Sequence, residues 1–142
     1  MTKYILHIEP KAQSRPRFTR QGRVYEQKDI TNWKKSVART LRLRNPKTIE
    51  KGAIFISLMF YIYPPQSTSK IKTKRPRTNE ELEKMFVNKR PDLDNYVKAI
   101  LDASNNILFK DDGQIAAVSS QKLYSLDPRI EIEIHKLEES ET

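Results

Sequence analysis

The segment from Ala53 to Tyr63 constrains the fold more than any other part of the sequence. It is an almost unbroken apolar run that stops at Pro64-Pro65. Neighbouring side chains of a strand point to opposite sides. One side then carries Ile54, Ile56, Leu58, Phe60 and Ile62, and the other carries Phe55, Met59, Tyr61 and Tyr63. Because both sides are largely apolar, we expect a central strand whose two faces are at least partly covered.

Shorter segments supply the rest of an α+β fold. Alternation predicts further strands over Tyr4–Ile8, Gln114–Tyr124 and Ile130–His135. Helical spacing and capping residues predict one helix from Asp29 or Thr31 to about Arg44, a short helix opened by Thr78 and Glu81, and one from Asp94 or Asn95 to about Ser104. We therefore expect a single domain over residues 1–142, with a mixed or antiparallel sheet of about four strands flanked by two main helices and one short helix.

Two segments do not show the pattern of a packed element. Residues 66–77 are polar, basic and rich in Ser and Thr. They predict a mobile loop that either orders on nucleic acid or serves only solubility. Residues 137–142 are acidic, which predicts a frayed C-terminus.

Charge indicates the class of partner. Of the 142 residues, 27 are basic and 18 acidic, which gives a formal charge of +9. This excess predicts a polyanionic partner, and the absence of a basic helix with a large apolar face favours nucleic acid over a membrane surface. The chain has no cysteine, which excludes disulfides and thiolate metal sites. No signal peptide or apolar run of membrane-spanning length is present, which predicts a cytoplasmic protein without membrane partners.

The basic residues concentrate in a few places. An acid-free stretch near the N-terminus holds candidate phosphate ligands, with a turn predicted at Gly22; these are Lys11, Arg15, Arg17, Arg20 and Arg23. Lys89 and Arg90 form a second candidate pair. The polar side of the first predicted helix carries Lys34, Lys35, Arg39 and Arg42. That side is either a solvated face or an extension of the phosphate-binding surface.

Acidic residues gather in two clusters despite the positive net charge. Asp92 lies in the extended segment that leads to Asp94 and the last predicted helix, and Asp94, Lys98 and Asp102 follow one another at spacing four along one side of that helix. Asp111 and Asp112 form the second cluster. One interpretation is a site for a hard divalent cation such as Mg²⁺. The other is a capped helix with ordinary i,i+4 ion pairs.

The two acidic segments, taken in order, resemble a known family. The stretch Arg90-Pro-Asp-Leu-Asp-Asn-Tyr-Val-Lys-Ala-Ile-Leu-Asp-Ala103, followed by Lys110-Asp-Asp-Gly-Gln-Ile115, is similar to the motifs of the RusA family of Holliday-junction resolvases. The segment Arg15-Pro-Arg-Phe-Thr19 resembles the opening of that family. The resemblance covers nearly the whole chain.

The resemblance implies a function and a set of site residues. Family members are Mg²⁺-dependent DNA endonucleases, with Mn²⁺ as a possible substitute, and many are carried by phages and prophages. They act as homodimers on four-way-junction DNA in recombination and repair and use no nucleotide cofactor. By resemblance, Asp92, Asp94 and Asp112 are the metal ligands and Lys98 a lysine important for activity. Asp102 and Asp111 match further acidic positions; Asp112 is preferred over Asp111 because Gly-Gln-Ile follows it.

The metal-site interpretation requires a particular arrangement of the aspartates. Asp92, Asp94 and Asp112 must converge on one cation beside a basic surface. The competing function is a nucleic-acid-binding protein without activity, in which the same aspartates only cap helices. A restriction-type nuclease fits poorly, because Lys98 lies on a helix rather than on a strand beside a second acid.

Overall fold

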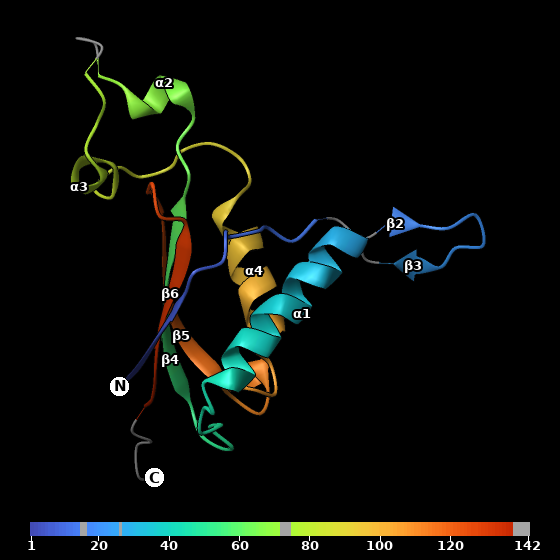
Figure 1. The fold of residues 1–142 in the computed structure, drawn as a ribbon. Coiled ribbons are helices and arrows are strands. Elements are labelled where there is room, and N and C mark those ends of the chain that lie inside the picture. Colours follow the sequence, from blue (N-terminus) through green and yellow to red (C-terminus); the bar gives the residue numbers. More distant parts are fainter. Residues whose placement is uncertain (15–16, 26, 72–74, 138–142) are drawn as a thin grey trace.

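The computed structural model describes residues 1–14, 17–25, 27–71 and 75–137. Figure 1 shows a sheet with two long helices beside it and a hairpin that projects from the body. The strands are β1 (Thr2–Leu6), β2 (Arg17–Phe18), β3 (Val24–Tyr25), β4 (Ile54–Ile62), β5 (Ile115–Tyr124) and β6 (Arg129–Lys136). The helices are α1 (Lys28–Leu43), α2 (Gln66–Ser69), α3 (Asn79–Leu82), α4 (Leu93–Ser104) and the 3₁₀ turn η1 (Asp112–Gln114).

The main sheet confirms the predicted fold class. Its strand order is β1-β6-β4-β5, so β4 lies inside the sheet, as its sequence predicts. β4 runs antiparallel to β6 and parallel to β5, and β1 is antiparallel to β6. The sheet is therefore mixed, and the domain is α+β.

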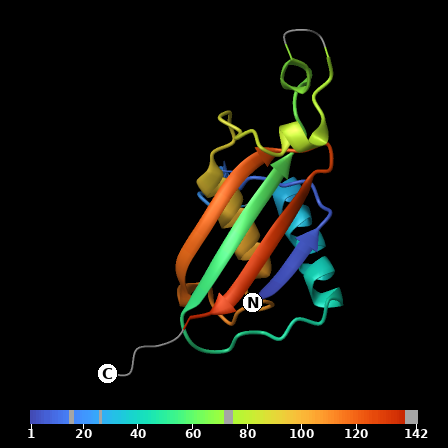
Figure 2. The same ribbon diagram turned by 90° about the vertical axis from the view of Figure 1, so that its left-hand side faces the viewer.

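Helices α1 and α4 cover only one face of the sheet. On that face Ile56, Leu58 and Phe60 are at most 1% exposed, and the ring of Phe60 lies 5.5 Å from that of Tyr96 in α4. Figure 2 shows the opposite face without a helix over it in the described part of the chain. Apolar residues there, such as Phe55, are half-buried by neighbouring strands rather than by a second layer.

Both long helices begin before the residues predicted to cap them. The N-cap of α1 is Gln27, not Asp29 or Thr31. Asp29 lies in the first turn, where its carboxylate accepts from the Ile30 N–H at 2.9 Å. The N-cap of α4 is Asp92, not Asp94 or Asn95. These corrections place Asp92 at the positive end of the α4 dipole.

The segment 66–77 is more ordered than predicted where the structure describes it. It opens with α2, and the Arg77 N–H donates to the Ser69 carbonyl at 2.8 Å, which closes the segment into a small lobe. The capping box of Thr78 and Glu81 is confirmed at the start of α3. Arg75 lies 3.1 Å from Glu81 and, with the backbone of Thr78, lowers the pKa of that carboxyl to about 2.

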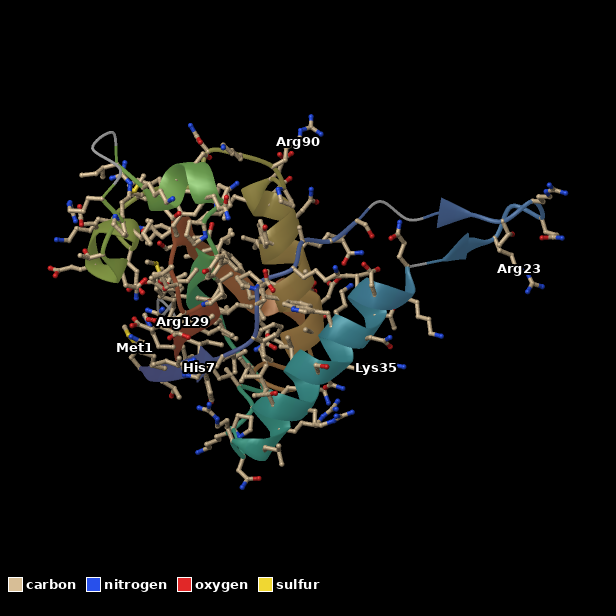
Figure 3. The ribbon with its side chains drawn as sticks, turned by 45° about the horizontal axis from the view of Figure 1, so that its top comes forward. Met1, His7, Arg23, Lys35, Arg90 and Arg129 are labelled. Carbon is tan, nitrogen blue, oxygen red and sulfur yellow. The ribbon has the colours of Figure 1, made fainter. Side chains whose placement is uncertain are left out.

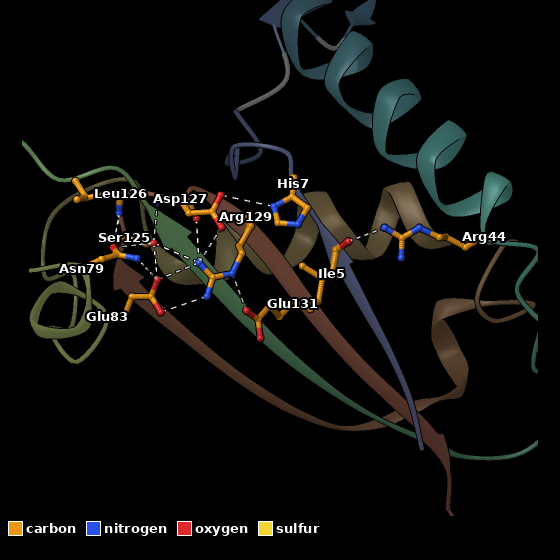
Figure 4. Close-up of polar contacts among 10 residues, drawn as sticks. All are labelled: Ile5, His7, Arg44, Asn79, Glu83, Ser125, Leu126, Asp127, Arg129 and Glu131. Atoms are coloured by element: carbon orange, nitrogen blue, oxygen red, sulfur yellow. Dashed lines mark hydrogen bonds and ion pairs between the residues drawn. The ribbon is translucent and has the colours of Figure 1, made fainter.

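An ionic cluster fastens α3 to the sheet (Figure 4). Arg129, which is mostly buried, donates to Glu131 at 2.7 Å and to Glu83 at 3.1 Å. Its guanidinium also lies 3.9 Å from the centre of the Tyr61 ring. Hydrogen bonding from Arg129 lowers the pKa of Glu83. This cluster fixes the chain just upstream of the acidic motif.

The N-terminal basic segment forms a hairpin that its sequence did not predict. β2 and β3 pair antiparallel, and the expected turn lies at Gly22, which has φ 78. A positive φ of this size favours glycine. Figure 1 shows the hairpin extending away from the sheet and helices.

No helix in the described residues is long and apolar enough to span a bilayer.

Candidate active site and nucleic-acid interface

The N-terminus of α4 presents two free carboxylates. Asp92, the N-cap residue, and Asp94, in the first turn, are both exposed. Among the described residues, neither side chain forms a hydrogen bond or an ion pair. Two acids without counter-ions at one helix end are available to bind a cation.

Lys122 holds the chain that leads into these carboxylates. Its ammonium group donates to the carbonyl of Lys89 at 2.8 Å and to that of Pro91 at 2.9 Å. Lys122 lies on β5 opposite the buried Phe60, on the side of the sheet that faces the helices. The sequence analysis missed this residue. The sequence indicates its role only by placing a lysine at a strand position whose side chain points towards the helices.

Lys98 and Asp102 lie on the same exposed side of α4 as Asp94, as the spacing predicts. The predicted alternative of i,i+4 ion pairs along this side is not observed among the described residues. Asp102 instead pairs with Lys34 of α1 at 3.2 Å. Asp102 therefore links the two long helices, whereas Lys98 remains unpaired in the described part of the chain.

The second acidic cluster lies beyond the C-terminus of α4. The Asp112 N–H donates to the side chain of Asn105, the C-cap residue of α4, at 3.1 Å. The Asp111 N–H donates to the Gln114 side chain at 2.9 Å, and Gln114 in turn donates to the carbonyl of Ile49 at 3.2 Å. Both aspartates are exposed. Their backbone positions are thus fixed, while their carboxylates face solvent.

The predicted convergence of Asp92, Asp94 and Asp112 within one chain is wrong. Asp94 and Asn105 are separated by about 16 Å along the helix axis, at 1.5 Å per residue. Asp112 is hydrogen-bonded to Asn105 and therefore lies at the far end of the helix. No three His, Asp or Glu side chains among the described residues lie close enough together to hold a metal ion. The helix between the two motifs keeps the acids of one chain at opposite ends.

The predicted phosphate ligands fall into three groups. Arg20 and Arg23 are exposed on the β2–β3 hairpin, and Figure 3 shows Arg23 far from the rest of the body. Lys89 and Arg90 are exposed just before α4. Arg15 lies outside the described residues, and Arg17 is described only as backbone in β2.

Lys11 differs from the other predicted phosphate ligands. Its ammonium group lies 3.1 Å from the Asp29 carboxylate, and this contact lowers the pKa of Asp29. Folding supplies an acid that is not near Lys11 in the sequence. Lys11 is therefore already partly neutralised.

Comparison with known proteins places this geometry in a family. The sequence model described as Endodeoxyribonuclease RusA matches residues 7–135, which include both acidic clusters. The chain belongs to the RusA family. Within this RusA-family chain, the matched region also contains the hairpin, α1 and the whole sheet except the first strand.

One relative matches this chain along nearly its full length. The protein YqaN of Bacillus subtilis strain 168, which is described as uncharacterized, is 33% identical over 138 residues. The match covers 95% of this chain and 96% of YqaN. As a member of the RusA family, the chain is an endodeoxyribonuclease by family, and DNA is its partner class.

Proposed function

We propose that this RusA-family chain is a divalent-metal-dependent endonuclease that resolves four-way DNA junctions by paired symmetric nicks. The observation that carries the proposal is the pair of exposed, unpaired carboxylates of Asp92 and Asp94 inside the family match. Exposed cations lie directly beside them in Lys89 and Arg90. Carboxylates that can bind a metal ion and positively charged side chains that can bind a phosphate are thus adjacent at the start of α4.

The donor set of Asp92 and Asp94 fits Mg²⁺, and Mn²⁺ by the same chemistry. Mg²⁺ in phosphoryl-transfer sites is usually held by one or two carboxylates, with waters and substrate phosphates completing its shell. Bound there, the ion would supply Lewis-acid polarisation of the phosphoryl oxygen and an activated water. Two carboxylates are sufficient for this role, and a third would tighten the site.

The chain's own residues have distinct roles in this proposal. Lys122 keeps Asp92 in place through the carbonyls that precede it. Arg90 contacts the phosphate next to the scissile bond. Lys98, one turn beyond Asp94, stabilises the negative charge that develops on the phosphate. The hairpin arginines Arg20 and Arg23 hold a DNA arm further from the cut.

A second copy of the chain would complete the acidic site. In a two-fold dimer each residue meets its counterpart by the same operation. If the two α4 helices lie antiparallel, Asp112 of one copy lies beside Asp92 and Asp94 of the other. Such a dimer also provides two sites for the two strands of a junction.

The surface of α4 supports this pairing. Leu93, Val97 and Leu101, at spacing four, form a half-buried apolar stripe on the flank of α4 that faces away from α1. Val118 on the adjacent strand β5 is 45% exposed. A half-exposed apolar strip of this kind is typical of an interaction surface.

The test is a cleavage assay on a synthetic four-way junction and a matched linear duplex, with and without Mg²⁺. We expect paired nicks in the junction alone, and only with the metal. Asp94→Asn should reduce the nicking rate by roughly 100-fold or more while leaving junction binding in metal-free buffer unchanged. Glu80→Gln, which alters an exposed acid of α3 away from both acidic clusters, is the matched control. Tight binding without metal-dependent nicking would instead establish the non-enzymatic alternative.

A further inference from the structure

A groove of about 630 Å³ runs between α1 and the C-terminal half of α4. Its α1 side carries Lys35, Arg39 and Arg42, and its α4 side carries Asp102 and Asn105. The small side chains of Ala38 and Ala103 line it between the two helices. The groove is thus open to solvent and bounded by cations on one side.

The charges in the groove do not cancel. Lys34 is paired with Asp102, the sole acid that lines the groove. Lys35, Arg39 and Arg42 are exposed and form no side-chain hydrogen bond or ion pair with any described residue. Figure 3 shows Lys35 pointing away from the sheet into solvent. Three unneutralised cations on one helix side predict an anionic occupant.

The spacing of these cations matches a sugar–phosphate backbone. Lys35 to Arg42 spans about 10 Å of helix at 1.5 Å per residue. Measured along the duplex axis, one strand of B-DNA carries about three phosphates over that length. A single small anion would use only one of the three cations.

The groove ends at the second acidic cluster. Asn105 lines the groove, and its side chain accepts from the Asp112 N–H at 3.1 Å. A strand that follows the cations towards the C-terminus of α4 therefore arrives at Asp112. Asp92, Asp94 and Arg90 lie at the opposite end of the helix.

We infer that the α1–α4 groove binds the sugar–phosphate backbone of one DNA strand and guides it to Asp112. This inference rests on the proposed function and names the surface that orients the substrate. A second copy of the chain is a poorer occupant, because the groove carries an excess positive charge that a copy with net charge +9 would not neutralise.

The first test measures binding to a four-way junction in metal-free buffer over a range of salt concentrations. Lys35→Gln/Arg39→Gln removes two groove cations, and Lys84→Gln/Lys136→Gln removes two exposed lysines elsewhere. We expect the groove variant to reduce the slope of log Kd against log salt by about 1.4–1.8, the value for two lost phosphate contacts. The control variant should change the slope by much less.

The second test locates the strand directly. Because the chain has no cysteine, Arg39→Cys and Lys136→Cys each introduce a single thiol. DNA with a thiol tethered to one backbone phosphate should form a disulfide with Arg39→Cys and not with Lys136→Cys.

The outcomes separate this inference from the proposed function. If the wild type nicks junctions but the groove and control variants lose the same slope, and both cysteines crosslink equally, the groove is not the DNA path. If the groove variant dissociates a dimer in sedimentation while DNA binding per chain is unchanged, a second copy occupies the groove and the inference is wrong. If the wild type binds no DNA, the proposed function fails first and the inference fails with it.

Discussion

At the scale of single residues, Lys122 shows how a charged side chain can build a site without lining it. An ammonium group has three donors. Two of them are used by the carbonyls of Lys89 and Pro91, on either side of Arg90. Both the cation beside the site and the carboxylate of Asp92 therefore depend on one lysine from another element.

We predict that Lys122→Met lowers activity by disturbing this segment. Loss of hydrogen bonds from a charged donor should cost about 1–2 kcal/mol in unfolding free energy. The Mg²⁺ concentration for half-maximal nicking should rise several-fold, because Asp92 is no longer held. Lys136→Met, at an exposed position of β6, is the control. An unchanged metal dependence in Lys122→Met would show that this lysine is only a packing residue.

The sequence could predict which side chains are exposed but not what pairs with them. The spacing of Asp94, Lys98 and Asp102 correctly places them on one exposed side of α4. The actual partner of Asp102 is Lys34, and that contact depends on how α1 crosses α4. No local pattern encodes such a contact, since the two residues are joined only by tertiary packing.

At the scale of elements, the two ends of α4 determine where the acidic clusters lie. The helix stops at Asn105, and Asn106 takes a left-handed conformation with φ 66. Asparagine tolerates this conformation better than other residues with a Cβ, apart from aspartate. The turn then directs the chain through buried Ile107 and Phe109 to Asp112.

We predict effects of different size for two substitutions at Asn106. Asn106→Val should cost about 2 kcal/mol, because a β-branched residue strongly disfavours positive φ. Asn106→Gly should change stability by less than about 1 kcal/mol. Chemical denaturation measures both, and nicking should fall in Asn106→Val because Asp112 is displaced. Equal stability of the two variants would contradict a left-handed Asn106.

Periodicity identified the long elements and missed the short ones. The buried residues of α1, α4 and β4 recur at a regular spacing over two or more turns or pleats. The strands β2 and β3 have two residues each and α2 has four. Elements this short show no detectable period. The strands β2 and β3 form by pairing with each other rather than from local propensity.

At the scale of the whole molecule, the acids of the proposed site lie at opposite ends of α4. A single chain offers Asp92 and Asp94 at one end and Asp112 at the other. Sequence motifs could name these acids because the two acidic segments resemble the family's motifs. They could not show that one chain keeps the acids apart, since that depends on the length and direction of the helix between them.

We predict that two inactive variants restore activity when their chains are mixed. Asp94→Asn and Asp112→Asn should each abolish nicking alone. A mixed dimer keeps one intact site, with Asp92 and Asp94 from one copy and Asp112 from the other. Refolding the two variants together should therefore recover nicking of one strand.

The control mixture is Asp92→Asn with Asp94→Asn. Both substitutions affect the same end of α4, so no mixed dimer has an intact site and no activity should return. Recovery in neither mixture would contradict the antiparallel dimer.

The 12 residues of α4 correspond to a rod of about 18 Å. In the proposed antiparallel pair the two cutting centres would lie at the two ends of this rod. The number of residues in one helix would then define the gap between incisions on the branched substrate. Adding one turn to α4 would widen that gap by about 5 Å.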